Sequence, residues 1–312
     1  LNDIGTSVLV APSGSIYLIG NYTGTVDFDP GQGTLNSTSK GDKDIFVNKL
    51  NSQGELIWHK TFGGQQYDQC VSACFDKSFN LILIGSISAE VNFGSSYTLT
   101  PKDSRTNFLF KLDSNGNTRW AKLTAGRSES IAIDSSGKLL LTGSFYGTAE
   151  FERQITSVDR RDAFVSKLDT AGRYLWTRTI GGYYNDYGFS IATDADMNVI
   201  VTGIYEGQVD LDPGITEHIR KSQGEADIFV MKLTPSGELY WVHSIGSRYD
   251  TRSYSLAIDS SGNSYITGWF QHSLQFEGRY RHYNLTSKGA ADLYLVKIGP
   301  HGRIEMAQSF GA

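Results

Sequence analysis

The stretch DIFVNKLNSQGELIWHKTFGG, residues 44–64, decides the fold because the chain repeats it four more times. Residues 162–182 read DAFVSKLDTAGRYLWTRTIGG, and residues 227–246 read DIFVMKLTPSGELYWVHSIG. Looser copies lie at residues 107–126 and 292–311. A short functional motif has no reason to recur five times, whereas a structural unit that buries its faces only against neighbouring units does.

The lysine of this stretch recurs at intervals of 62, 56, 65 and 65 residues, as Lys49, Lys111, Lys167, Lys232 and Lys297. Nine residues after each lysine comes a large side chain, in turn Trp58, Trp120, Trp176, Trp241 and Met306. We expect these large side chains to form a structural core that fills the gap between adjacent repeats. We expect the lysines to bury their stems between repeats and to place each ammonium near a turn carboxylate.

A second block recurs out of phase with the first, and SIAIDSSGKLLLTG (residues 130–143) is a clear copy of it. Its two β-rich runs flank a turn in which Asp134 is expected to form an Asx turn and Gly137 to supply a positive φ. Each repeat therefore has four strands, and no helical periodicity exceeds one turn. Repeats of about 60 residues with four strands are typical of propeller blades. The sequence predicts an all-β fold, a five-bladed β-propeller with four antiparallel strands per blade.

The five units fill the whole chain as a single propeller domain over residues 1–312. Their approximate bounds are residues 1–64, 65–126, 127–182, 183–247 and 248–312. By this count the first unit opens with an inner strand and the last closes with an outer strand, so no strand is left to join the first and last blades. Either the ring closes through packing between the faces of the first and last blades alone, or this assignment of strands to blades is shifted by one strand.

The segments DIFVxKLxxxGxxxWxxxxGG, SIAxDSSGNxYxTG and VDFDPG resemble the SBBP-type repeats of bacterial β-propellers. The resemblance covers all five units. It implies a propeller fold and an exported setting, extracellular or at the cell surface, because such repeats occur mostly in secreted and cell-surface proteins. The family's name assumes seven blades, so five units are a departure that fits either a five-bladed ring or part of a larger array. The resemblance implies no chemistry, because the shared residues are structural.

Composition and charge exclude several classes of protein. The net charge of −5 argues against nucleic acid as a partner, and no apolar run is long enough to span a membrane. The chain begins at LNDIGTS without a signal peptide or initiator Met, so we expect a processed or excised piece. Cys70 and Cys74 would lie about 13 Å apart on one strand, too far for a disulfide, and we expect two small buried side chains.

The loops are expected to gather polar residues on one face. In a propeller, the connection from the second to the third strand and the connection from blade to blade open on the same face. The first kind is acidic in two units, with Asp27, Asp29, Asp210 and Asp212 in VDFDPG and VDLDPG. The second kind holds carboxylates beside tyrosines, namely Tyr67, Asp68, Tyr184, Asp186, Tyr187, Tyr249 and Asp250.

Three interpretations of this face remain open. In the first, each aspartate caps a turn and the tyrosines pack between blades. In the second, the alternate carboxylates Asp27, Asp29, Asp210 and Asp212 bind Ca²⁺, the one cofactor considered, although the spacing lacks the EF-hand pattern. In the third, the tyrosines and aspartates of the blade-to-blade loops form a glycan or peptide site.

An enzyme is the least favoured class. A catalytic pair should break the repeat symmetry, and Glu129 is the only such acid expected near the channel mouth, so the sequence offers one acid where a pair is required. The histidines form no metal spacing, and His59 and His243 fall on expected outer strands. No GxSxG, HExxH, P-loop or GxGxxG motif is present. We therefore predict no catalytic residue, and a glycoside-active enzyme with a central carboxylate site ranks third.

The sequence favours a non-catalytic exported or cell-surface module for binding or structural interaction. Such a module would belong to a larger surface protein or assembly, with a protein or glycan as its partner. The alternative is a lectin-like propeller with similar sites on the loops of each blade.

Overall fold

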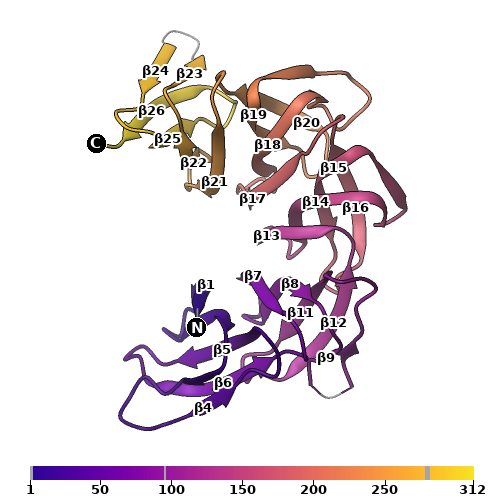
Figure 1. Cartoon of the computed structure of the whole chain (residues 1–312), viewed down its shortest axis with the longest axis vertical. Helices are drawn as coiled ribbons and strands as arrows, with labels where there is room; N and C mark the ends of the chain where they lie inside the picture. The colour runs from indigo at the N-terminus through magenta and orange to yellow at the C-terminus, as the bar shows by residue number, and fades with distance from the viewer. Residues whose placement is uncertain (1–2, 95, 278–281) are drawn as a thin grey trace. The chain divides into compact units, whose positions relative to one another are not determined.

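The computed structural model describes residues 3–94, 96–277 and 282–312. Over these residues the chain is all β, without a helix, and forms five four-stranded antiparallel sheets (Figure 1). The predicted fold is confirmed, because these sheets are the blades of a five-bladed β-propeller. The chain divides into two compact units, Leu1–Ser128 and Glu129–Ala312, which are described separately below.

The first unit contains blades 1 and 2. Blade 1 consists of β1 (Ile4–Val10), β2 (Ile16–Tyr22), β5 (Asp44–Leu50) and β6 (Leu56–Phe62). Blade 2 consists of β7 (Gln69–Phe75), β8 (Leu81–Ile87), β11 (Thr106–Leu112) and β12 (Thr118–Thr124). Two short hairpins lengthen the connections between second and third strands, β3 (Thr25–Asp27) with β4 (Asn36–Thr38) and β9 (Val91–Asn92) with β10 (Thr98–Leu99).

The second unit contains blades 3, 4 and 5, although β13 begins two residues before the boundary. Blade 3 consists of β13 (Arg127–Ile133), β14 (Leu139–Glu150), β15 (Gln154–Leu168) and β16 (Tyr174–Ile180). Blade 4 consists of β17 (Tyr187–Thr193), β18 (Val199–Asp210), β19 (Ile219–Leu233) and β20 (Leu239–Ile245). Blade 5 consists of β21 (Thr251–Ile258), β22 (Ser264–Phe270), β25 (Asp292–Ile298) and β26 (Ile304–Phe310), with a hairpin of β23 (Ser273–Glu277) and β24 (His282–Thr286).

Every blade is built from strands that follow one another in the chain. Among the described strands, none of the five sheets takes a strand from a neighbouring blade, so blade 1 opens with β1 and blade 5 closes with β26. The strand order predicted from the sequence is therefore correct.

The turns within the blades show why these residues form hairpins. Asp134 Oδ1 accepts hydrogen bonds from the amides of Ser136 and Lys138, at 2.8 and 2.9 Å, which is the expected Asx turn. Gly137 follows with a φ of 88°, a conformation that costs glycine little because it has no Cβ. Side chain and backbone together close the turn between β13 and β14.

The core lies between neighbouring blades, which explains why the strands are apolar on both faces. In the first unit, one cluster joins Ile19 of β2 to Phe108 of β11. In the second unit, another cluster joins Ile228 of β19 to Phe270 of β22 and Tyr294 of β25. A blade that was polar on one face could not be covered on both sides in this way.

Candidate functional site

The two kinds of loop expected to share a face do meet. The amide of Asp68, between blades 1 and 2, donates to Lys43 O at 2.8 Å, just before β5. The amide of Asp186, between blades 3 and 4, donates to Arg161 O in β15 at 2.7 Å. In these two junctions, a backbone hydrogen bond therefore joins the blade-to-blade loop to the third strand of the preceding blade or to the residue just before it.

Two of the predicted site aspartates are buried within these junctions. Asp68 accepts hydrogen bonds from the amides of Gly64 and Ser88, at 2.6 and 3.0 Å. Asp186 accepts them from Gly182 and Glu206, at 2.9 and 3.2 Å. Burial raises the pKa of Asp68 and raises that of Asp186 to about 8. Both carboxyl groups hold loop backbone in place.

Asp250 lies differently from Asp68 and Asp186. It is half-buried, and its Oδ2 lies 3.7 Å from Nε of Arg252. Its carbonyl accepts the amide of Gln271 at 3.2 Å. The three aspartates predicted for one site thus belong to separate junctions, each of which connects its own pair of blades.

The tyrosines of these loops are mostly covered by other side chains. Cationic groups of Lys43 and Arg105 lie 5.0 Å from the ring centre of Tyr67. The ring of Tyr249 stacks on His272 at 3.9 Å, with Arg248 at 4.9 Å.

Blade 4 contains the two remaining tyrosines of the predicted site. Tyr187 stacks on Phe189 with 6.0 Å between ring centres, whereas Tyr184, beside Gly207, keeps half of its surface exposed. Of the predicted site tyrosines, Tyr184 therefore offers the most open ring.

The predicted calcium residues cap their own loops. Asp27 Oδ1 accepts the amides of Asp29 and Leu35, at 3.0 and 2.7 Å. Asp210 Oδ1 accepts those of Asp212 and His218, at 3.0 and 2.8 Å. Asp29 and Asp212 in turn accept the amides of the glycines two residues on.

Calcium binding at these loops stays a prediction. No group of three or more His, Cys, Asp or Glu side chains in the described part of the chain is arranged to hold a metal ion. A thermal melt of chelator-treated protein with and without added Ca²⁺ checks it, and an unchanged melting temperature would contradict it.

Three of the repeated tryptophans bridge neighbouring blades. The indole N–H groups of Trp58, Trp176 and Trp241 donate at 3.2 Å to turn carbonyls of the next blade, those of Ser114, Pro235 and Pro300. These rings also lie against the turn glycines Gly116, Gly237 and Gly302. All five side chains of the predicted repeat core, Trp120 and Met306 included, are half-buried rather than fully buried.

The repeated lysines serve the same bridges. Lys49, Lys167 and Lys232 donate to the turn carbonyls that accept the tryptophans, at 2.9, 3.4 and 3.0 Å. The expectation that the ammonium lies near a turn carboxylate is confirmed for three lysines, in the pairs Lys111–Asp76, Lys167–Asp134 and Lys232–Asp194 at 2.6 to 2.8 Å. Lys297 pairs instead with Glu305 of β26, at 2.8 Å.

Blade 5 presents an uncovered apolar face within the second unit. Leu293 and Phe310 are 56% and 53% exposed. At the same repeat positions of blade 4, Ile228 and Ile245 are 1% and 3% exposed, because they pack in a cluster that includes blade 5 residues. Blade 5 thus has apolar side chains at positions that blade 4 buries against its neighbour.

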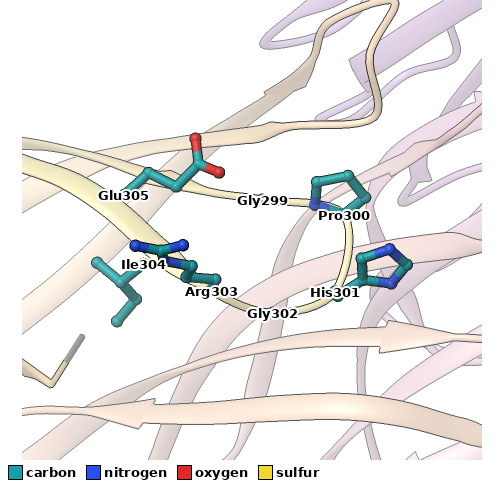
Figure 2. Close-up of a pocket in the computed structure, with 7 residues that line it drawn as sticks. All are labelled: Gly299, Pro300, His301, Gly302, Arg303, Ile304 and Glu305. Atoms are coloured by element: carbon teal, nitrogen blue, oxygen red, sulfur yellow. The ribbon is translucent and has the colours of Figure 1, made fainter. Parts of the chain in front are cut away.

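A surface hollow of about 500 Å³ lies on the turn between β25 and β26. Seven consecutive residues, Gly299–Glu305, line it, and Figure 2 shows His301 near the tip of the turn and Glu305 on the strand that follows it. His301 Nδ1 lies 3.0 Å from the Tyr240 hydroxyl, and Glu305 pairs with Lys297. Both groups thus serve contacts within the second unit, and the hollow carries no separate chemistry.

One segment of the repeat matches a known family. Residues 241–269, which run from β20 of blade 4 to β22 of blade 5, match the family model of SBBP, described as a β-propeller repeat. This segment carries an SBBP-type β-propeller repeat. The match confirms the resemblance drawn from the repeated segments.

Two curated relatives of the chain are much longer proteins. The chain is 22% identical over 331 residues to an uncharacterized WD repeat-containing protein, L264, of Acanthamoeba polyphaga mimivirus, covering 85% of this chain and 24% of that protein. It is 27% identical over 107 residues to the regulatory protein FlaEY of Caulobacter vibrioides, covering 34% of this chain and 11% of that protein. The chain therefore spans about a quarter or less of these relatives.

Among solved structures, the chain is similar to a protein of unknown function from Dyadobacter fermentans. The TM-score is 0.45 at 10% identity, covering 98% of this chain and 94% of that one. In the described part of the chain, no helix is long and apolar enough to cross a membrane.

The two cysteines of the chain both lie on β7 as free thiols. Cys70 is buried and Cys74 is half-buried, and burial raises the pKa of each thiol to about 12. Neither thiol is therefore activated as a nucleophile.

The repeat pattern did not predict one polar network, which lies in blade 1. His59 Nε2 lies 3.0 Å from Ser37 Oγ, and His59 Nδ1 lies 2.6 Å from Asn48 Oδ1. The signal was present in the aligned repeats, because Asn48 and His59 replace the apolar pair found in blades 2, 4 and 5. Ser37 could not be found in this way, since it belongs to a hairpin that the alignment of repeats does not cover.

Proposed function

We propose that this chain is an exported or cell-surface module for binding or structural interaction, and that it acts as part of a larger surface protein or assembly. The repeated lysines, tryptophans and buried aspartates hold blades and loops together, so the positions common to the repeats are occupied by structural roles. Partner binding then falls to surfaces that the repeat leaves open.

The observation that carries this proposal is an apolar face of blade 5 that the other blades of the second unit do not cover. Leu293 and Phe310 keep more than half of their surface exposed at positions where blade 4 buries its side chains. The inner strand fits the same pattern, because the hydroxyl of Ser190 in blade 4 accepts the amide of Leu256 at 3.2 Å, whereas Ser255, its counterpart in blade 5, is exposed. A further blade of this type matches the face in both apolar character and hydrogen bonding.

The exported setting rests on the resemblance to SBBP repeats, which occur mostly in secreted and cell-surface proteins. The length of the relatives supports a module within larger proteins, because each is several times longer than the matched region.

The test is the molar mass of native material purified from its source, measured by light scattering together with identification of co-purifying proteins. We expect a mass above 34.4 kDa, a partner that is lost in Leu293→Asp, and a partner that is retained in Leu175→Asp. Leu175 is a matched control because it is an exposed leucine of the same unit, on β16. A clean monomer without a partner would argue against the assembly role.

A glycan site is the second candidate, favoured by the open ring of Tyr184. Tyr183 beside it is also exposed, and Glu206 Oε2 accepts the amide and side-chain N–H groups of Asn185 at 3.3 Å. An aromatic face next to amide and carboxylate groups suits a sugar ring and its hydroxyls. A glycan array with wild-type and Tyr184→Ala protein tests this site, and an array without any binder would count against it.

A further inference from the structure

Blade 1 contains a polar network that breaks the repeat. Asn48 of β5 and His59 of β6 are direct cross-strand partners. The corresponding pairs are apolar in blades 2, 4 and 5, namely Phe110–Ala121, Met231–Val242 and Val296–Ala307. In blade 3 they are Ser166 and Thr177, whose hydroxyls bond to each other at 2.9 Å. Only blade 1 places an imidazole there.

The imidazole of His59 lies between an amide and a hydroxyl. Its Nδ1 is 2.6 Å from Asn48 Oδ1, and its Nε2 is 3.0 Å from Oγ of Ser37, on β4. Because Asn48 Oδ1 is an acceptor, Nδ1 donates the ring proton, and Nε2 is left to accept the hydroxyl proton of Ser37. A hydroxyl, a base and an orienting group thus follow one another at hydrogen-bonding distances, which is the arrangement of an activated serine.

The surroundings keep His59 uncharged near neutral pH. The ring of Phe28 stacks on the imidazole with 4.2 Å between ring centres and 22° between ring planes. Burial, followed by the charge of Lys60, lowers the pKa of His59. A neutral imidazole can accept a proton, whereas an imidazolium cannot. Asn48 is buried, so the group that orients the ring is itself held in place.

The backbone beside Ser37 supplies a hydrogen-bond donor. In the hairpin of β3 and β4, Phe28 N donates to Leu35 O and Ser39 N donates to Gly24 O. Antiparallel strands alternate such pairs, so the amide of Ser37 points toward β3 and that of Thr38 points away from it. The amide of Thr38 can therefore donate to the carbonyl oxygen of a substrate, which becomes negative when Ser37 Oγ attacks the carbonyl carbon.

We propose that Ser37 is a nucleophile toward esters with an apolar acyl group, with His59 as its general base and Asn48 as a positioning residue. The apolar preference follows from the aromatic cluster of Tyr22, Phe28 and Phe46 next to the imidazole. This activity goes beyond the interaction function proposed above and does not depend on it.

The reaction balances with water alone. Ser37 Oγ bonds to the acyl carbon while its proton moves to His59 Nε2, and the alcohol leaves as its oxygen takes that proton. Water then attacks the acyl-serine, gives its proton to His59 Nε2 and releases the carboxylic acid as Ser37 Oγ is protonated again. The net change is one ester and one water converted into one acid and one alcohol.

The experiment treats the full chain with a small fluorophosphonate and, separately, with p-nitrophenyl acetate, and maps the adducts by mass spectrometry. Ser39 is an internal control on the same hairpin, because its hydroxyl contacts Gly24 N and Gly41 O and no histidine. We expect modification of Ser37 at least about 100-fold faster than that of Ser39, and a loss of about 100-fold in His59→Ala. Ser37 and Ser39 are compared within the same wild-type molecule, so this result does not depend on whether a variant folds.

The pH profile distinguishes chemistry from a merely structural contact. The rate of Ser37 modification should rise as His59 loses its proton, with a midpoint below pH 6.5 because the pKa is lowered. Asn48→Asp should move that midpoint upward, since a carboxylate stabilises the imidazolium. Equal modification of Ser37 and Ser39 by both probes would overturn the proposal, as would a midpoint that does not move in Asn48→Asp.

Discussion

Lys232 shows how a charged side chain is accommodated where both faces of a sheet are covered. Its ammonium lies 2.8 Å from Asp194 Oδ2 and 3.0 Å from Pro300 O of the next blade. Burial alone would raise the pKa of Asp194, but hydrogen bonds from Lys232 and Asn198 outweigh burial and hold that pKa below its usual value. The ion pair is thus satisfied on both sides, as a buried pair must be.

Removing this lysine should be costly. In Lys232→Met, the Asp194 carboxylate stays buried without its cation, so we expect the free energy of unfolding to fall by about 3 kcal/mol. Lys297→Met is the matched control, because its pair with Glu305 has side chains 26% and 37% exposed and should contribute much less to stability. Urea unfolding measures both variants, and equal losses would contradict the assigned difference in burial.

The tryptophans show what sequence alone leaves undetermined about single residues. Their constant spacing from the lysines predicts a position between blades, and three of them do bond to the next blade. The degree of burial depends on how closely the neighbouring turn approaches, which the spacing does not contain. A loss of about 3–5 kcal/mol would apply to a fully buried ring, so half-buried Trp241 should lose less on truncation.

Trp241→Phe tests the bond rather than the ring. Phenylalanine keeps an aromatic group against Gly302 and removes the N–H that donates to Pro300 O at 3.2 Å. We expect a loss of about 1 kcal/mol in urea unfolding. Met306→Leu at the same repeat position removes no N–H donor, and its midpoint should stay close to that of the wild type.

At the scale of the strand, the residue five positions before each repeated lysine, on the third strand, is matched to the residue that follows the fourth strand. A Cβ on Gly246 would lie 2.0 Å from the carboxylate carbon of Asp227, and Gly63, Gly181 and Gly311 lie as close to Asp44, Asp162 and Asp292. Blade 2 changes both positions together, with Thr106 and Ala125. The hydroxyl of Thr106 nevertheless accepts a hydrogen bond from the amide of Lys102, four residues earlier. Asp44 and Asp227 likewise accept hydrogen bonds from the amides four residues before them.

This pairing predicts a rescue. Gly246→Ala forces the new methyl group into the Asp227 carboxylate and should lower the free energy of unfolding by about 1–3 kcal/mol. Adding Asp227→Thr copies blade 2 and should recover part of that loss, giving a coupling energy in a double-mutant cycle. Strictly additive losses would show that the two positions do not act together.

Elements were more predictable than the site. Short apolar runs and Asp–x–x–Gly turns mark the strands, because these features depend on only a few neighbouring residues. The Asx turn at Asp134 formed as expected. Asp68 and Asp186 could be read as ligands or as loop supports, and that choice depends on which distant amides reach them. Those of Ser88 and Glu206 lie 20 residues further along the chain, beyond any local pattern.

For the molecule as a whole, buried acids set the response to pH. Burial raises the pKa of Asp186 to about 8, and that of Asp162 and Asp227 to about 6. The unfolded chain ionises its aspartates near pH 4, so folding takes up protons between that pH and these values. Stability from these groups is therefore lost as the pH rises.

Between pH 6.5 and 8, the contribution of Asp186 to the pH dependence of stability can be measured separately from that of the buried histidines. Burial lowers the pKa values of His59 and His243, so the pH dependence due to these histidines lies below pH 6.5. We expect the free energy of unfolding to fall by about 1 kcal/mol per pH unit across this range, and Asp186→Asn to flatten the slope. Urea unfolding at pH 6.5, 7.25 and 8 gives the slope, and a stability that rises with pH would contradict the assignment.

Because each of the five described blades consists of strands that follow one another in the chain, the unit that a gene duplication would copy coincides with the unit of hydrogen bonding. A tandem copy inserted between β6 and β7 brings a complete sheet with its own turns, and the remaining sheets keep all their backbone partners. Loss of one repeat likewise leaves no orphaned strand edge. The number of blades in such a chain can therefore change through recombination without leaving a sheet that lacks one of its strands.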